Sequence, residues 1–158
     1  MTIYQLKSRF QNILRPAVEK LAARGVTANQ VTLAALALSA VCGGLLYLAP
    51  HSRVPYLLLP LGLLVRMALN AIDGMLAREY NMKSTLGMYL NELGDIASDF
   101  LLYLPWCVVP GATPWLVAVV VLLSVSSEVT GILTQTITKT RRYEGPMGKS
   151  DRAFVFGA

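Results

Sequence analysis

Two pairs of an amide and a carboxylate stand at helical spacing between residues 70 and 95. Asn70 and Asp73 are three residues apart, and Asn91 and Asp95 are four apart, so each pair lies on one face of a helix. Side-chain oxygens that converge from two helices suit a hard divalent cation such as Mg²⁺ or Mn²⁺. Zinc is disfavoured because this stretch contains no His or Cys. Asp99 continues the second stripe four residues beyond Asp95. The spacing therefore predicts a site for a hard divalent cation where the two polar faces meet.

Four long apolar segments must position these polar side chains. The 158-residue chain is 54% hydrophobic and 15% charged, with a mean hydropathy of +0.52, which exceeds what a soluble core can bury. Each segment has roughly the 20 residues that a helix needs to cross the hydrocarbon, and no period-two alternation indicates a barrel. We predict an all-α, polytopic transmembrane bundle with four full spans and the start of a fifth. The full spans are expected at about residues 31–49, 54–77, 86–109 and 115–138.

Basic residues are concentrated on one side of the predicted spans. Five of them precede the first span, whereas the opposite side offers only His51, Arg53 and the uncharged connection PGATPW. The excess of Lys and Arg places the N-terminus and the polar stretch on the cytoplasmic side of the plasma (inner) membrane. Because the formal net charge of +5 is located at membrane ends, we expect membrane lipids as partners and no nucleic acid.

The N-terminal segment has the pattern of a helix that lies in the membrane interface. Ile3, Leu6, Phe10 and Ile13 recur at spacings of three and four, with basic residues off this stripe. A plain anchor is the simpler interpretation, and a gate for substrate is the alternative. We divide the chain into this juxtamembrane helix, residues 1–25, and a transmembrane domain, residues 26–158.

The polar stretch resembles the signature of the CDP-alcohol phosphatidyltransferases, D-x2-D-G-x2-A-R-x8-G-x3-D-x3-D. Eight positions at fixed spacing make this a specific match. The segment GVTANQVTL is similar to the family's entrance to the first span, at Thr27, Asn29 and Thr32. The resemblance covers the chain from about Gly25 onward. The matched signature positions are Asn70, Asp73, Gly74, Ala77, Arg78, Gly87, Asn91 and Asp95.

The resemblance implies a metal-dependent transferase of phospholipid biosynthesis. Such an enzyme passes a phosphatidyl (substituted phosphate) group from a CDP-alcohol, such as CDP-diacylglycerol, to a polar acceptor alcohol and releases CMP. It implies that Asp95 is the general base and also joins Asn70, Asp73 and Asn91 around the metal. A homodimer is among the assemblies that we allow for. The residues expected around the nucleotide are Thr32, Gly74, Ala77, Arg78 and Gly87.

The sequence departs from the signature at its first and third acidic positions, which are Asn70 and Asn91. An amide oxygen still binds a hard cation, but its lack of charge weakens the affinity and favours Ca²⁺ or Mn²⁺ over Mg²⁺. Asp99 and Glu92 are poorly placed to compensate, since one lies two turns beyond Asn91 and the other points away from it. A catalytically silent protein that binds a nucleotide or a cation is therefore an alternative, and so is a transporter.

A second basic cluster follows the fourth span, in TKTRRYEGPMGKSDRA. Lys149 and Arg152 are predicted to bind phosphate, such as that of a phosphorylated acceptor, beside a fifth helix that opens at Ser150 or Asp151. Positive-inside anchoring explains the same charges without a ligand. The fifth helix would stop at Ala158, about a third of the way across the membrane, whereas the family has six spans. We therefore expect the domain to be truncated at its C-terminus.

Two charged residues lie inside predicted spans. Arg66 and Glu128 are about 18 and 16 Å from the nearest basic residues at the span ends. Because an unpaired charge at that depth costs at least about 2.5 kcal/mol, we predict that the two side chains pair.

Overall fold

The computed structural model describes residues 3–138, with side chains from residue 9 to residue 133. This part of the chain folds into five α-helices and one 3₁₀-helix, without a strand, which confirms the predicted all-α class. The predicted fifth span, with Lys149 and Arg152, lies outside the described residues. The elements are α1 (Ile3–Ala23), α2 (Ala28–Leu48), α3 (Arg53–Glu79), α4 (Thr85–Tyr103), η1 (Leu104–Val108) and α5 (Pro114–Thr138).

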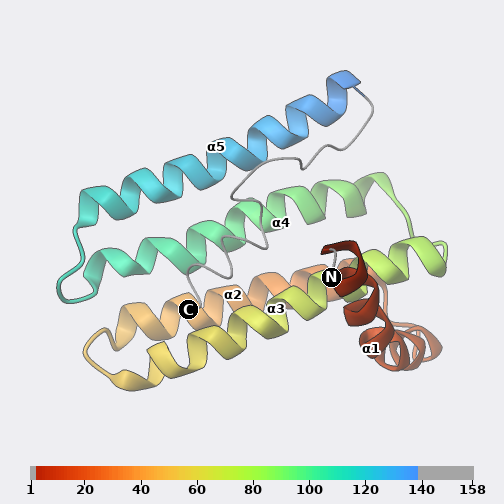
Figure 1. Cartoon of the computed structure of the whole chain (residues 1–158), viewed down its shortest axis with the longest axis horizontal. Coiled ribbons are helices and arrows are strands. Elements are labelled where there is room, and N and C mark those ends of the chain that lie inside the picture. The colour runs from red at the N-terminus through yellow and green to blue at the C-terminus, as the bar shows by residue number, and fades with distance from the viewer. Residues whose placement is uncertain (1–2, 139–158) are drawn as a thin grey trace.

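Consecutive helices from α2 to α5 run antiparallel, and α1 lies at a steep angle to them at the end of the bundle where α3 ends (Figure 1). Helix α2 packs against both α3 and α4, and α4 packs in turn against α5. No Cα atom of α3 lies within 8 Å of a Cα atom of α4. Helix α2 therefore acts as a spacer between the two helices that carry the polar signature.

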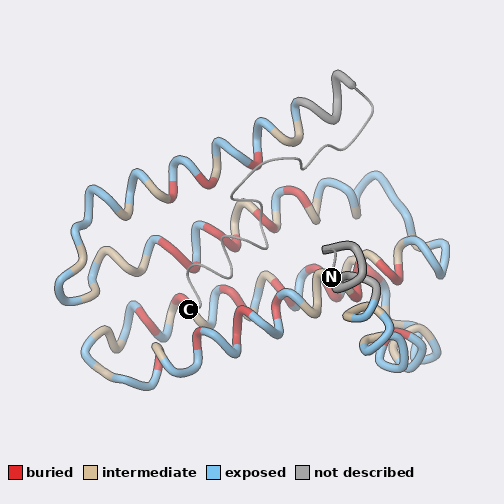
Figure 2. The backbone as a smooth tube through the Cα atoms, in the orientation of Figure 1, coloured by how far each residue is buried: buried red, intermediate tan, exposed pale blue. Residues whose placement is uncertain are grey.

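Within the described part of the chain, three helices are long and apolar enough to cross a membrane: α2, α3 and the Pro114–Leu133 part of α5. The segment predicted as the third span forms α4 and η1, and it is less apolar because Glu92, Asp95 and Asp99 lie within α4. The tube in Figure 2 shows buried positions on the inward faces of the helices and exposed positions on the outward faces. Many large apolar side chains, such as Leu57 and Leu122, are exposed there. This arrangement is that of a polytopic helical bundle.

A capping box fixes the beginning of α2. The backbone N–H of Gln30 donates to the Thr27 hydroxyl oxygen at 3.3 Å, and the backbone N–H of Thr27 donates to Oε1 of Gln30 at 2.9 Å. Ser84 caps α4 in a simpler way, because its hydroxyl oxygen accepts a hydrogen bond from the Gly87 N–H at 2.9 Å. These caps satisfy backbone donors that a helix start leaves free, and they set the residue at which each helix begins.

Two glycines allow α2 to approach its neighbours closely. Gly43 of α2 lies against the backbone carbonyl of Leu101 in α4, and Gly62 of α3 lies against the sulfur of Cys42 in α2. A Cβ atom at either glycine would overlap these atoms. Close approach increases the dispersion contacts that hold helices together where lipid, rather than water, surrounds them.

Helix α1 is attached to the end of α3 by an apolar contact and an ion pair. Val18 is 1% exposed and belongs to a buried cluster with Met75 and Leu76 of α3. The guanidinium of Arg15 donates to both carboxylate oxygens of Glu79, at 2.7 and 3.3 Å. On the other side of α1, Ile13 is 75% exposed, which fits a helix that rests on lipid. Its location in the membrane interface stays a prediction.

The two adjacent glycines of α2 provide a test of this packing. We expect Gly43→Ala to lower the stability of the protein by about 1–3 kcal/mol, because the added methyl group overlaps the Leu101 carbonyl. The matched control is Gly44→Ala, whose Cβ would meet no atom within 4 Å. Thermal unfolding in detergent should show a lower midpoint for Gly43→Ala and an unchanged or higher one for Gly44→Ala. Equal midpoints would contradict a close α2–α4 contact at Gly43.

Candidate active site

Helix α3 carries a polar stripe toward its C-terminal end. Arg66, Asn70 and Asp73 follow one another at spacings of four and three, so they share one face of the helix. Arg66 is 3% exposed and Asp73 is 5% exposed, while Asn70 is half-buried. Charged groups buried to this extent in an apolar bundle require polar partners.

Thr32 of α2 is one partner of Asp73. The Thr32 hydroxyl donates to Oδ2 of Asp73 at 2.9 Å and lies 3.1 Å from the carbonyl oxygen of Ala28. The sequence predicted Thr32 only as a neighbour of the nucleotide. The structure shows that the Thr32 hydroxyl connects α2 to the carboxylate of Asp73 on α3.

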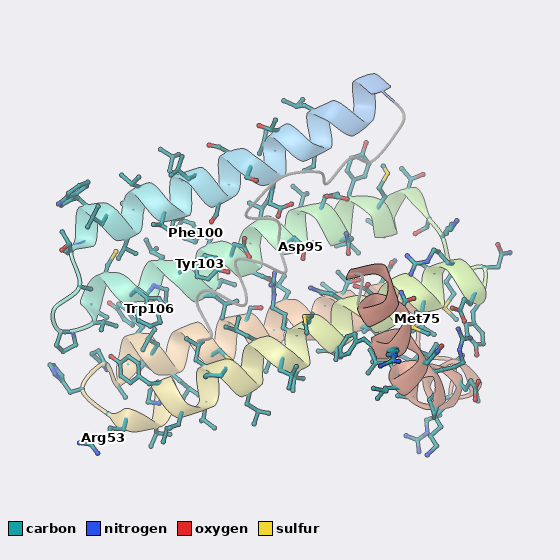
Figure 3. The ribbon with its side chains drawn as sticks, in the orientation of Figure 1. Arg53, Met75, Asp95, Phe100, Tyr103 and Trp106 are labelled. Carbon is teal, nitrogen blue, oxygen red and sulfur yellow. The ribbon has the colours of Figure 1, made fainter. Side chains whose placement is uncertain are left out.

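Arg66 connects α3 to α4. Its Nη2 atom lies 3.5 Å from Oδ1 of Asp95 and 3.5 Å from Oδ1 of Asp99. Asp95 projects from the middle part of α4, as Figure 3 shows. The sequence analysis named Glu128 as the partner of Arg66, whereas the ion pairs that the structure shows for Arg66 are on α4. Glu128 is buried in α5, at 6% exposure.

The polar residues of α3 and α4 lie at matching distances from the two helix ends that the α3–α4 connection joins. Asp73 is six residues before the end of α3 and Asn91 is six residues after the start of α4, so both are about 9 Å from their helix ends. Asn70 and Asp95 follow at about 14 Å, and Arg66 and Asp99 at about 20 Å. Each level thus combines one acid with an amide or a cation.

The two lower levels offer the donor set of a hard divalent cation. Asp73 and Asp95 supply carboxylate oxygens, and Asn70 and Asn91 supply amide oxygens. Among the described residues, no three Asp, Glu, His or Cys side chains form a cluster that could hold a metal. The amides would therefore have to complete the coordination, and the residue types fit that task.

The side chain of Arg78 packs against Gly74, one turn earlier on α3. A Cβ atom at Gly74 would lie 3.1 Å from Nη1 and 3.3 Å from Nη2 of Arg78. The family resemblance implies that Gly74 and Arg78 both lie around the nucleotide, and in the structure the guanidinium of Arg78 lies against Gly74. The positive charge is thereby held beside the residue that follows Asp73, near the end of α3.

Gly87 has a similar role at the start of α4. A Cβ atom there would lie 2.7 Å from Oδ1 of Asn29 and 3.0 Å from the hydroxyl oxygen of Ser84. The three residues of the GVTANQVTL segment that match the family's entrance to the first span thus have separate contacts. Thr27 caps α2, Asn29 lies against Gly87 of α4, and Thr32 donates to the carboxylate on α3.

Comparison with known proteins identifies the family. The family model described as CDP-alcohol phosphatidyltransferase matches residues 25–156, which include all of these polar residues. The chain belongs to the CDP-alcohol phosphatidyltransferase family. Members of this family act on a CDP-alcohol and an alcohol acceptor and are generally dependent on a divalent metal.

Two bacterial proteins are similar to this chain. It is 52% identical to "Inner membrane protein YnbA" of Escherichia coli (strain K12) over 157 residues, which are 99% of this chain and 78% of that protein. It is 35% identical to an "Uncharacterized protein" of Aquifex aeolicus (strain VF5) over 97 residues, which are 61% of this chain and 47% of that protein. No solved structure gives a significant match. The first relative's name agrees with the three apolar helices in indicating a membrane protein.

Sequence reasoning missed the ion pair between Arg66 and Asp99. The signal was present, because Arg66 continues the stripe of Asn70 and Asp73, and Asp99 continues that of Asn91 and Asp95. Glu92, judged to point away from the metal ligands, is buried at 7% exposure. The stripe on α3 was not extended to Arg66, because Arg66 was expected to pair with Glu128 of α5.

The contact between Thr32 and Asp73 can be tested by removing the hydroxyl group. Thr32→Val keeps the shape of the side chain but takes one hydrogen bond from a buried carboxylate, so we expect a loss of about 1–3 kcal/mol in stability. Thermal unfolding in detergent measures the loss. Thr32→Ser keeps the hydroxyl group and should remain close to the wild type. If the Ser variant loses as much as the Val variant, the methyl contact rather than the hydrogen bond is important.

Proposed function

We propose that the protein transfers a phosphatidyl group from CDP-diacylglycerol to a polar acceptor alcohol and releases CMP, as a step of phospholipid biosynthesis. The observation that carries this proposal is the family signature, which lies on two facing helices that α2 keeps apart. Direct packing of α3 on α4 would leave no room for a diphosphate between their polar faces. The acceptor is a polar alcohol, and a phosphorylated one would suit the basic cluster that contains Lys149 and Arg152.

A divalent metal would be held by Asn70, Asp73, Asn91 and Asp95. Oxygen donors suit Mg²⁺ or Mn²⁺, and Ca²⁺ is the alternative because two of the four donors are uncharged amides. When bound, such an ion neutralises charge on the diphosphate and on the departing CMP.

The nucleotide would lie near the cytoplasmic ends of α3 and α4. Arg78 is the exposed cation there, seated on Gly74, and it would pair with a phosphate oxygen of the CDP group. Gly87 would let the start of α4 stay close to α2 beneath the nucleotide. Ala77 and Thr32 complete this part of the pocket.

Asp95 would act as the general base. Its carboxylate is held by Arg66 and would take the proton of the acceptor hydroxyl group as the hydroxyl oxygen attacks the phosphorus of the phosphatidyl group. A new oxygen–phosphorus bond forms, and the bond between that phosphorus and the oxygen of CMP breaks. The negative charge that develops on CMP would be offset by the guanidinium of Arg78.

A groove between α2 and α4 supports a lipid donor over a soluble CDP-alcohol. Its volume is about 180 Å³ and its walls are almost entirely apolar. Thr32 belongs both to this groove and to the hydrogen bond with Asp73. An acyl chain in the groove would therefore begin beside the proposed diphosphate site. The lining residues are Thr32, Leu33, Leu36, Leu90, Leu93, Gly94 and Ala97.

The proposed setting is the plasma (inner) membrane, with the N-terminus and the site on the cytoplasmic side. The excess of basic residues at the ends of the bundle that carry the signature supports this orientation. Cytoplasmic CDP-lipid headgroups would then reach the site directly. A homodimer remains part of the proposal for the assembly, and residues 26–158 are proposed as one transmembrane domain.

A silent nucleotide- or cation-binding protein is the second candidate. The observation that favours it is the absence, among the described residues, of a three-acid cluster that could hold a metal. Measurement of CMP release from CDP-diacylglycerol, with Mg²⁺ or Mn²⁺ and a panel of polar alcohols, separates the two candidates. No release with any alcohol would reject the transferase.

Asp95→Asn tests the proposed base. We expect CMP release to fall by about 10²–10⁴-fold while binding of CDP-diacylglycerol is largely kept, because the change acts on the chemical step. The comparison variant is Asp99→Asn, which alters the other carboxylate partner of Arg66 and should give a much smaller loss. Unchanged turnover in Asp95→Asn would remove Asp95 from the mechanism.

The groove can be tested by filling it. Ala97→Phe should raise the KM for long-chain CDP-diacylglycerol by about tenfold or more, because each methylene kept from its site loses about 0.8 kcal/mol. A short-chain CDP-diacylglycerol should show little change. The matched control is Ala34→Phe, at an exposed position of α2 outside the groove. Equal KM values for long-chain donor in both variants would place the acyl chain elsewhere.

A further inference from the structure

We infer that Arg66 is a built-in cation of the site that positions Asp95, and that residue 70 must be uncharged for Arg66 to do so. The inference rests on the proposed transferase function. It assigns a role to a residue that lies outside the family signature, and it gives a reason for the amide at the first signature position.

The first argument is geometric. Arg66 of α3 forms ion pairs with two carboxylates of α4, both through Nη2 and both at 3.5 Å. The two helices have no Cα atoms within 8 Å of each other, so a long side chain is needed to reach across. Arg66 therefore holds the carboxylate of Asp95 at a fixed place relative to the face of α3 that carries Asn70 and Asp73.

The second argument concerns charge. Asp95 and Asp99 are four residues apart on one face of α4, and their side chains are only 10% and 3% exposed. Two carboxylates so close in an apolar bundle repel each other strongly, because the effective dielectric constant is low. The guanidinium between them offsets one negative charge and holds both carboxylates toward α3. Asp95 is thus fixed before any substrate binds.

The third argument explains Asn70. It lies four residues after Arg66, the spacing at which an Arg and an Asp on one helix form an ion pair. An Asp at position 70 would compete with Asp95 for the guanidinium. The amide does not compete through charge, and its Nδ2 atom is buried without a hydrogen-bond partner in the described structure. Asn91 is different, because it lies about 10 Å closer to the helix ends than Arg66 does.

The two amides therefore provide a matched pair of variants. Asn70→Asp and Asn91→Asp each add one carboxylate to the site, but only the first adds it within reach of Arg66. Mn²⁺ binding to the protein in nanodiscs, without nucleotide, should tighten by about tenfold in Asn91→Asp. In Asn70→Asp it should change by less than about twofold, because Arg66 neutralises the new carboxylate. Asn70→Asp combined with Arg66→Gln should recover the tighter binding.

Turnover gives a second measurement. Asn70→Asp should lower kcat for CMP release by about tenfold with little change in the KM for CDP-diacylglycerol, since Asp95 is displaced and the nucleotide pocket is not. Arg66→Gln should also lower kcat, and Arg66→Lys should restore part of it because the charge is kept. Asn70→Asp combined with Arg66→Gln should be no slower than Arg66→Gln alone. Without Arg66, the carboxylate added at position 70 has no guanidinium to draw away from Asp95.

Two results would overturn the inference. One is Mn²⁺ binding in Asn70→Asp that tightens as much as in Asn91→Asp. The other is an Arg66→Lys variant as slow as Arg66→Gln although both remain folded by thermal unfolding. If the wild type and every variant release no CMP, the transferase proposal fails, but the Mn²⁺ measurements still decide whether Arg66 engages residue 70.

Discussion

The close packing of α2 against both α3 and α4 is the constraint on which the site depends. Gly43 and Gly62 allow these contacts, and the capping box at Thr27 sets the point at which α2 begins. With α2 in this position, the polar faces of α3 and α4 are opposite each other but do not pack together. The bundle therefore gains its dispersion energy from α2, while the two signature-bearing helices remain available for polar groups and substrate.

Burial of charge is the second constraint, and the bundle meets it with side chains from three helices. Asp73 accepts a hydrogen bond from α2, and Asp95 and Asp99 share the guanidinium of Arg66 from α3. Each of these contacts joins two helices, so the groups that solvate the carboxylates also position them. In an apolar surrounding, the loss of one partner leaves the other uncompensated, and stability and site geometry are therefore linked at the same residues.

Membership in the CDP-alcohol phosphatidyltransferase family defines the general reaction, and the residues of this chain give it a particular form. Two of the four acidic signature positions are amides, and Arg66 lies one helical turn before the first of them. The amides reduce the negative charge available to a metal, while Arg66 offsets charge at Asp95. We interpret these changes together, as a site in which a protein cation takes over part of the charge balance.

The sequence by itself determined the helical bundle and the local pairs of the signature. Span length and apolar content fix helices in lipid, and spacings of three and four place Asn70 with Asp73, and Asn91 with Asp95, on single faces. Sequence periodicity also gives the depth of a residue along its helix, but it does not say which neighbouring helix that face meets. Asp99 and Glu128 were both deep enough to pair with Arg66, and only the packing of α2 between its neighbours turned Arg66 toward α4. The Thr32–Asp73 bond likewise required tertiary structure, because residues 41 positions apart meet only when two helices pack.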